Sequence, residues 1–98
     1  MQPEEQIEIT RRLRTAEGHL RAVISMVEAG EPCEQVLYQL GAVRSALRIA
    51  GDRLLTCQVE TCEDVIRYST CQEERVAEIK RLSTLYQIML KSYKYNRE

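Results

Sequence analysis

The sequence predicts an all-α fold, and three observations support this class. The 98 residues include only four glycines and two prolines, so few residues interrupt a helix. Apolar residues recur at intervals of three and four, the period of one helix face. Phe and Trp are absent, and charged residues make up 30% of the chain. This composition favours amphipathic helices over an all-β or a disordered chain.

The first predicted helix covers residues 4–29. Pro3 and the acidic Glu4 suit the first turn of a helix, and Gly30 suits its end. One face is apolar, and its members are Leu13, Ala16, Leu20, Val23 and Val27. This spacing predicts an amphipathic helix.

The second predicted helix covers residues 32–63 and opens at Pro32. No further proline interrupts it, and its apolar positions are Val36, Leu40, Val43, Leu47, Ala50 and Leu54. Gly41 and Gly51 each cost about 1 kcal/mol relative to alanine inside a helix. We therefore expect another helix to approach the backbone closely at these two glycines.

The third predicted helix covers residues 73–93, after a polar connection. Its predicted buried stripe consists of Val76, Ile79, Leu82, Leu85 and either Ile88 or Met89. With no internal repeat and no low-complexity segment, residues 1–98 are expected to form a single all-helical domain.

The length of the second helix predicts self-association. About thirty residues extend roughly 45 Å, whereas a globule of this chain length is roughly 33 Å across. Two flanking helices are too short to cover an apolar stripe of this length. We expect an antiparallel four-helix-bundle dimer of three-helix protomers, assembled further as a dimer of dimers.

Charge and composition restrict the function classes. The net charge is −1, so binding to DNA requires a local basic patch. No apolar run approaches the roughly 18 residues of a membrane span, and acids and arginines stand where a secretion signal would be apolar. We expect a cytoplasmic protein with no membrane partner and reduced thiols. It has no Cys–His pair at a catalytic spacing, so we expect no enzyme and no required cofactor.

Two of the four cysteines share one face of the second helix. Cys33 and Cys62 are separated by 29 positions, which places them about 20° apart around the axis but about 43 Å apart along it. In an antiparallel dimer, Cys33 of one copy can meet Cys62 of the other, which gives two equivalent dithiol sites. Gln58 lies close to the same face. Cys57 points about 120° away from Cys33 and is read as a small core residue, while Cys71 falls in the connection.

The segments RRLRTAEGHLRAVISMVEAGEPCEQVLYQLGAVRSAL and LLTCQVETC resemble the copper-sensitive operon repressor (CsoR/RcnR) family of all-helical bacterial transcriptional repressors. The resemblance covers about residues 7–90. It implies dimers of three-helix protomers, paired into tetramers, that bind operator DNA without a helix-turn-helix. An inducer bound between subunits is then expected to release the DNA.

The resemblance also implies roles for individual residues. Cys33 and Cys62 match the two sensing cysteines, while Gln58 stands where copper and nickel sensors carry a histidine. Glu78 matches the acidic partner in the third helix. A site with two thiolates and no imidazole is most similar to the persulfide-sensing branch, the CsoR-like sulfurtransferase repressors.

Persulfide sensing is chemically reasonable at this cysteine pair. The positive end of the helix dipole favours the thiolate of Cys33, which follows Pro32. Attack on a persulfide modifies Cys33, and the partner's Cys62 then resolves it to an inter-subunit di-, tri- or tetrasulfide. The single histidine, His19, is read as a surface or packing residue of the first helix.

Two alternatives stay open. In the first, the chain is a repressor of the same family that senses Cu(I) or another thiophilic metal through Cys33, Cys62 and Cys57. In the second, it is a thiol or metal carrier, a helical dimer that does not bind DNA and has no need of arginines on its first helix.

Arginines supply the expected DNA contacts. Eleven of the fourteen basic residues are Arg, the side chain suited to bidentate phosphate contacts. The candidates are Arg11, Arg12, Arg14 and Arg48. Arg12 matches a family position implied in operator binding, whereas Ile49 occupies the family's second-helix arginine position and Arg48 precedes it. Arg21 and Arg53 are read as solvated surface residues.

Overall fold

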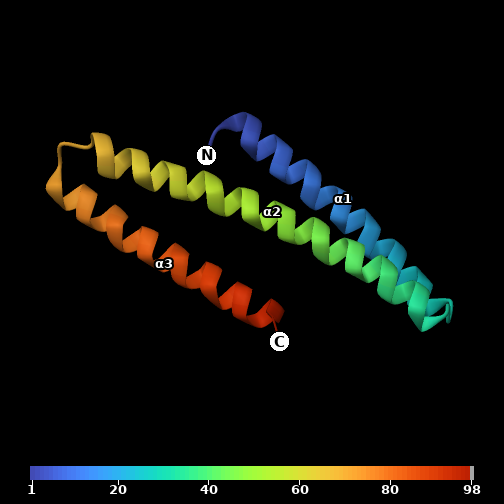
Figure 1. Ribbon diagram of the computed structural model, residues 1–98. Coiled ribbons are helices and arrows are strands. Elements are labelled where there is room, and N and C mark those ends of the chain that lie inside the picture. Colours follow the sequence, from blue (N-terminus) through green and yellow to red (C-terminus); the bar gives the residue numbers. More distant parts are fainter. Residues whose placement is uncertain (98) are drawn as a thin grey trace. The chain divides into compact units, whose positions relative to one another are not determined.

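The computed structural model consists of three α-helices (Figure 1). It describes the backbone of residues 1–97 and the side chains of residues 1–91. The helices are α1 (Pro3–Glu28), α2 (Cys33–Tyr68) and α3 (Gln72–Arg97), and residues 1–97 contain no strand. The predicted all-α class is confirmed.

The helix ends differ from the predicted ones by more than one residue at two places. α2 was predicted to end at residue 63 but continues to Tyr68, and α3 continues past residue 93 to Arg97. Residues 64–68 contain neither Gly nor Pro, and Val65 and Ile66 are half-buried, so both local preference and packing extend α2. The connection is therefore shorter than predicted and covers residues 69–71.

The chain divides into two compact units, Met1–Leu54 and Leu55–Glu98. α2 contributes its first part to one unit and its second part to the other. The single domain expected for residues 1–98 stays a prediction.

In the first unit, α1 lies antiparallel to the first part of α2 (Figure 1). Its buried side chains recur at seven-residue intervals on both helices: Ile9, Ala16, Val23, Val43 and Ala50. A seven-residue interval is two helical turns and keeps these residues on one narrow seam. Because Ala16 and Ala50 have small side chains, this seam contains little buried side-chain volume.

Gly30 forms the turn that joins α1 to α2. Its φ of 70° is left-handed, a conformation that glycine adopts without the steric cost met by other residues. Its amide donates to the Val27 carbonyl (3.0 Å), and the Glu31 amide donates to the Met26 carbonyl (3.1 Å). These bonds satisfy carbonyls that the end of a helix leaves free, and the predicted stop near Gly30 is confirmed.

Larger apolar residues flank the buried seam of the first unit and stay exposed. Leu13 and Leu20 are each 40% exposed, and Leu47 is 46% exposed. Within one chain the predicted stripe is buried at Ala16, Val23, Val43 and Ala50 but exposed at these leucines, because two helices bury only the strip along which they touch. The leucines are available to a second copy, and the expected dimer stays a prediction.

No helix within the described chain meets the expectation for the two glycines of the second helix, and the approach of a second copy there stays a prediction. A Cβ built at Gly41 or at Gly51 would meet no described atom within 4 Å beyond its own local backbone. No helix of the same chain therefore approaches the backbone closely at either position.

In the second unit, the second part of α2 packs against α3 through few buried groups. Cys62 is the one side chain among residues 55–91 that is fully buried. The buried stripe predicted for the third helix was wrong within one chain, since Val76 is 44% and Ile79 is 52% exposed. At the far end of α2, the Arg75 Nε donates to the Ile66 carbonyl (3.0 Å). Beside it, Ser69 Oγ donates to Glu74 (2.9 Å) and accepts from the Cys71 amide (3.2 Å). These bonds order the turn that brings α3 back along α2.

Candidate functional site

Cys62 is the centre of a small polar cluster inside the second unit. α2 carries Cys62 and, one turn earlier, Gln58, so both face the same side of the helix. α3 carries Glu78 against them. The Cys62 side chain has 0% exposure, and it is hydrogen-bonded to the side chains of Glu78 and Gln58. A fully buried thiol therefore meets a half-buried carboxyl group and a half-buried amide.

Burial raises the pKa of the Cys62 thiol above its ordinary value of 9.0. Its hydrogen bond to Glu78 and the negative charge of that residue act in the same direction, since both disfavour the thiolate. The positive charge of Arg81 and the hydrogen bond with Gln58 oppose them more weakly. In the isolated chain, Cys62 is thus a neutral thiol at neutral pH.

Glu78 has capacity left for a further contact. Its Oε2 atom is buried and has no hydrogen-bond partner among the described residues. A buried carboxylate oxygen without a donor is costly. This oxygen can therefore accept a hydrogen bond that the described part of a single chain does not supply.

Cys33 lies in the first unit and differs from Cys62 in its surroundings. It is the first residue of α2 and is exposed, and the preceding Pro32 carbonyl accepts from the amides of Gln35 (3.0 Å) and Val36 (3.2 Å). The predicted position at the start of the helix is confirmed. Its expected meeting with Cys62 requires a second copy of the chain and stays a prediction.

The two remaining cysteines lie in the second unit. Cys57 is half-buried, and its carbonyl accepts from Thr61 Oγ1 at 2.9 Å. Cys71 is exposed in the connection before α3, as predicted. Among the described residues of one chain, no three His, Cys, Asp or Glu side chains are grouped so that they could hold a metal ion. The three-cysteine metal set of Cys33, Cys62 and Cys57 stays a prediction that needs a second copy.

His19 makes a contact between helices within the first unit. Its Nε2 atom is 2.7 Å from the amide Oε1 atom of Gln39 on α2. The imidazole N–H donates this bond, which the amide oxygen can only accept. This contact supports the interpretation of His19 as a packing residue of α1.

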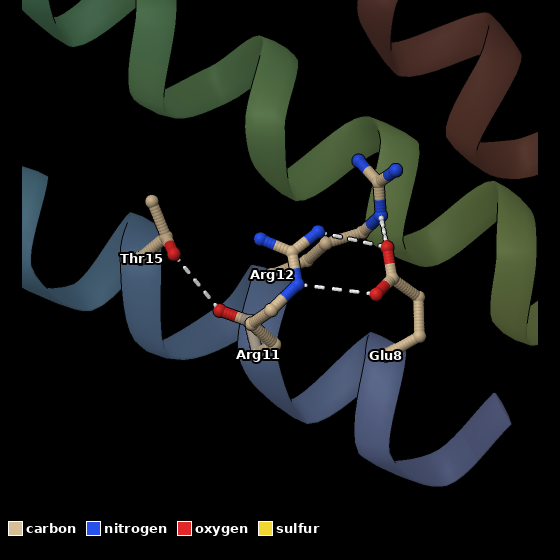
Figure 2. Close-up of polar contacts among 4 residues, drawn as sticks. All are labelled: Glu8, Arg11, Arg12 and Thr15. Carbon is tan, nitrogen blue, oxygen red and sulfur yellow. Dashed lines mark hydrogen bonds and ion pairs between the residues drawn. The ribbon is translucent and has the colours of Figure 1, made fainter. Parts of the chain in front are cut away.

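The candidate DNA-binding arginines all belong to the first unit, and two of them share one carboxylate (Figure 2). Arg11 donates through Nε (3.1 Å) and Nη2 (2.8 Å) to the two oxygens of Glu8. Arg12 donates through Nε to Glu8 Oε1 at 3.0 Å. The hydrogen bond from Arg11 and the charges of both arginines lower the pKa of Glu8 from 4.5 to about 2.

Arg14 and Arg48 are exposed, and within residues 1–91 neither forms a salt bridge. Glu8 was not predicted as a member of this cluster. The signal was present in the sequence, because Glu8 precedes Arg11 and Arg12 by three and four positions, the intervals that bring side chains together on a helix.

Comparisons with known proteins are consistent with this architecture. Residues 5–88 match the family described as metal-sensitive transcriptional repressor. The copper-sensing transcriptional repressor CsoR of Mycobacterium ulcerans is 45% identical over 51 residues, which are 52% of this chain and 44% of that protein. CsoR of Bacillus subtilis is 34% identical over 58 residues, 59% of this chain and 57% of that protein. The chain thus spans about half the length of the curated relatives it matches.

A solved structure has the same fold. A variant of the formaldehyde-responsive regulator FrmR from Salmonella enterica serovar Typhimurium superposes with a TM-score of 0.73 at 24% identity. The match covers 89% of this chain and 96% of that chain. Separately, no helix within residues 1–97 combines the length and the apolar character that crossing a membrane requires.

Proposed function

We propose that this chain, which belongs to the metal-sensitive transcriptional repressor family, is an operator-binding repressor that a thiol-reactive inducer releases from DNA. Members of this family and the curated relatives above are repressors rather than enzymes. In our proposal, Cys62 of one copy and Cys33 of a second copy form the inducer site. The protein is then a homodimer or a homotetramer.

The residue next to Cys62 supports persulfide, or sulfane sulfur, as the inducer. Gln58, not a histidine, is hydrogen-bonded to the buried thiol, and the single imidazole of the chain, that of His19, is bonded to Gln39. A carboxamide is a poor ligand for a soft cation such as Cu(I). Thiol chemistry with a persulfide needs no imidazole.

The proposed reaction uses two thiols and one persulfide. The thiolate of Cys33 attacks the outer sulfur of a persulfide R–S–SH, forming Cys33–S–SH and releasing the thiolate of R–SH. The thiolate of the second copy's Cys62 then attacks the Cys33 sulfur, forming a disulfide and expelling hydrosulfide. In total, two thiols lose two electrons, the outer sulfur gains them as H₂S, and R–SH carries the remaining proton. Further persulfide lengthens the bridge to a tri- or tetrasulfide.

A second candidate inducer is Cu(I), which the names of the curated relatives support. Thiolates are the ligands that Cu(I) prefers. Cys62 would supply one and the second copy's Cys33 another. Cys57 is the candidate third ligand, although it is five residues before Cys62 and so points about 140° away on a straight helix.

The two inducers can be separated by one set of measurements. After the protein is exposed to a persulfide donor, fluorescence anisotropy of labelled operator DNA measures the release of DNA, and mass spectrometry of the protein detects links between cysteines. Release with a Cys33–Cys62 link is expected, and Cys33→Ser and Cys62→Ser should abolish both. Cys71→Ser is the matched control, because Cys71 is exposed in the connection. A stoichiometric Cu(I) complex that releases DNA, with no effect of persulfide, would establish the copper candidate instead.

Gln58→His provides an independent check on the inducer. An imidazole beside Cys62 would give a Cu(I) site the ligand it lacks, and we expect the affinity for Cu(I) to rise by roughly tenfold or more. Competition against a chelator measures this gain. If the unmodified protein already binds Cu(I) as tightly as the Gln58→His variant, Gln58 does not disfavour copper and persulfide loses this support.

Four arginines of the first unit are the proposed DNA contacts: Arg11, Arg12, Arg14 and Arg48. Arg12→Ala should weaken operator binding and reduce its salt dependence, because each lost phosphate contact removes about one unit from the slope of log affinity against log salt. Arg21→Ala is the matched control on the same helix. A protein with the expected thiol chemistry and no operator binding at physiological salt would instead be the thiol or metal carrier.

A further inference from the structure

Glu8 occupies a position between two of the proposed DNA contacts. Its side chain is 35% exposed, while those of Arg11 and Arg12 are 61% and 28% exposed. Three N–H groups from the two arginines converge on its two oxygens (Figure 2). This carboxylate therefore neutralises half of the positive charge of the pair.

The carboxylate occupies a particular edge of each guanidinium group. Arg11 presents Nε and Nη2 together, which is the edge that also binds a phosphate in bidentate fashion. Arg12 donates through Nε alone, so both of its terminal nitrogens are outside this contact. A phosphate that approaches the pair meets one arginine whose bidentate edge is already taken.

The pair stays charged and occupied at neutral pH. With a pKa of about 2, Glu8 is fully ionised at any pH at which the protein would bind DNA. Exposed ion pairs of this kind are weak in water, so a phosphate can displace the carboxylate. The displaced carboxylate of Glu8 stays on the same helix turn, and its negative charge still repels the phosphate.

We propose that Glu8 is a built-in brake on DNA binding, a carboxylate that competes with phosphate for Arg11 and Arg12 and so sets the affinity of the first unit for nucleic acid. This inference rests on the proposed function. It assigns to Glu8 the control of how strongly the arginines hold any duplex. A low affinity for unrelated DNA would let an inducer clear the protein from its operator completely.

The test compares two charge-neutralising variants on the same helix. Glu8→Gln keeps the size of the side chain and removes the charge. Glu17→Gln makes the same change in net charge at an exposed position that has no salt bridge within residues 1–91. Binding of operator DNA and of an unrelated duplex is measured by anisotropy at several salt concentrations.

We expect Glu8→Gln to bind both duplexes more tightly at ~0.1 M salt, by about threefold to tenfold for each copy of the chain that contacts the DNA. The salt dependence of binding should be steeper, because each such copy neutralises one more phosphate. Glu17→Gln should change binding by much less. In a double variant that carries Arg11→Ala and Arg12→Ala, adding Glu8→Gln should change the affinity for DNA no more than adding Glu17→Gln does. Circular dichroism confirms that each variant keeps its helices.

The possible failures are distinguishable. If Arg12→Ala weakens DNA binding but Glu8→Gln binds no more tightly than Glu17→Gln, the brake is refuted and the proposed function stands. If Glu8→Gln binds more weakly than the unmodified protein, Glu8 orients the arginines instead, and the brake is again refuted. If the unmodified protein binds neither duplex, the proposed function and the brake fail together.

Discussion

Replacing Gly30 by alanine tests the turn that sets the start of α2 and hence the position of Cys33. Gly30 has a φ of 70°, and the left-handed conformation costs other residues about 1–2 kcal/mol. Alanine also restricts the unfolded chain, which returns roughly 0.4–1 kcal/mol. A new Cβ would meet no described atom within 4 Å, so no steric clash is added. Gly30→Ala should therefore lower the free energy of unfolding by about 1 kcal/mol.

Gly18→Ala is the matched substitution with the opposite expected sign. Gly18 lies inside α1, is exposed, and also has no described atom within 4 Å of a built Cβ. Alanine is favoured over glycine inside a helix by about 1 kcal/mol. The two variants should differ by about 2 kcal/mol, and each kcal/mol shifts Tm by about 4–8 °C in a domain of this size.

The assay is thermal and urea denaturation followed by circular dichroism at one fixed protein concentration, since self-association makes Tm concentration-dependent. A Gly30→Ala variant as stable as the unmodified protein, alongside a stabilised Gly18→Ala variant, would refute the left-handed turn. Equal destabilisation by both would show that the helix at Gly18 is not as described.

Two further predictions concern titratable groups. Glu78→Gln removes the negative charge that raises the pKa of Cys62, so the pKa of this thiol should fall toward its ordinary value. The ultraviolet absorbance of the thiolate as pH rises, in a chain whose other cysteines are replaced by serine, measures this change, and an unchanged Cys62 midpoint would contradict the contact. Glu8 should titrate with a midpoint of about 2 by carboxyl NMR, and its lowered pKa means that the ion pairs stabilise fully above pH 4.5 and lose this effect as pH falls toward 2. Arg11→Ala should return the midpoint toward 4.5, and a midpoint already near 4.5 in the unmodified protein would rule out the pairing.

Much of the fold was predictable because helix signals are local. Proline, acidic residues and glycine mark the ends of α1, and the three- and four-residue apolar spacing identifies all three helices. The end of α2 was predicted five residues too early. The absence of Gly and Pro from residues 64–68 was a local signal for a longer helix, whereas the partial burial of Val65 and Ile66 depends on tertiary packing.

The division of each apolar stripe into buried and exposed residues was not predictable. Ala16 and Leu20 belong to the same predicted stripe, yet Ala16 is 2% exposed and Leu20 is 40% exposed. A hydrophobic period specifies a face about 100° wide, whereas contact between two helices covers only its central strip. Which residues occupy this strip depends on the crossing of the helices.

The sequence by itself determined the residues available to the candidate sites: a cysteine at the start of α2, another near its end with Gln58 one turn before, and the four arginines proposed to contact DNA. These follow from composition and from the fixed geometry of a helix. Only the tertiary structure decided that Cys62 is buried against Glu78 and keeps its proton, because burial and charge depend on which helix packs beside it. Likewise, helical spacing allowed Glu8 to reach Arg11 and Arg12, but only the side-chain conformations decided that it binds both.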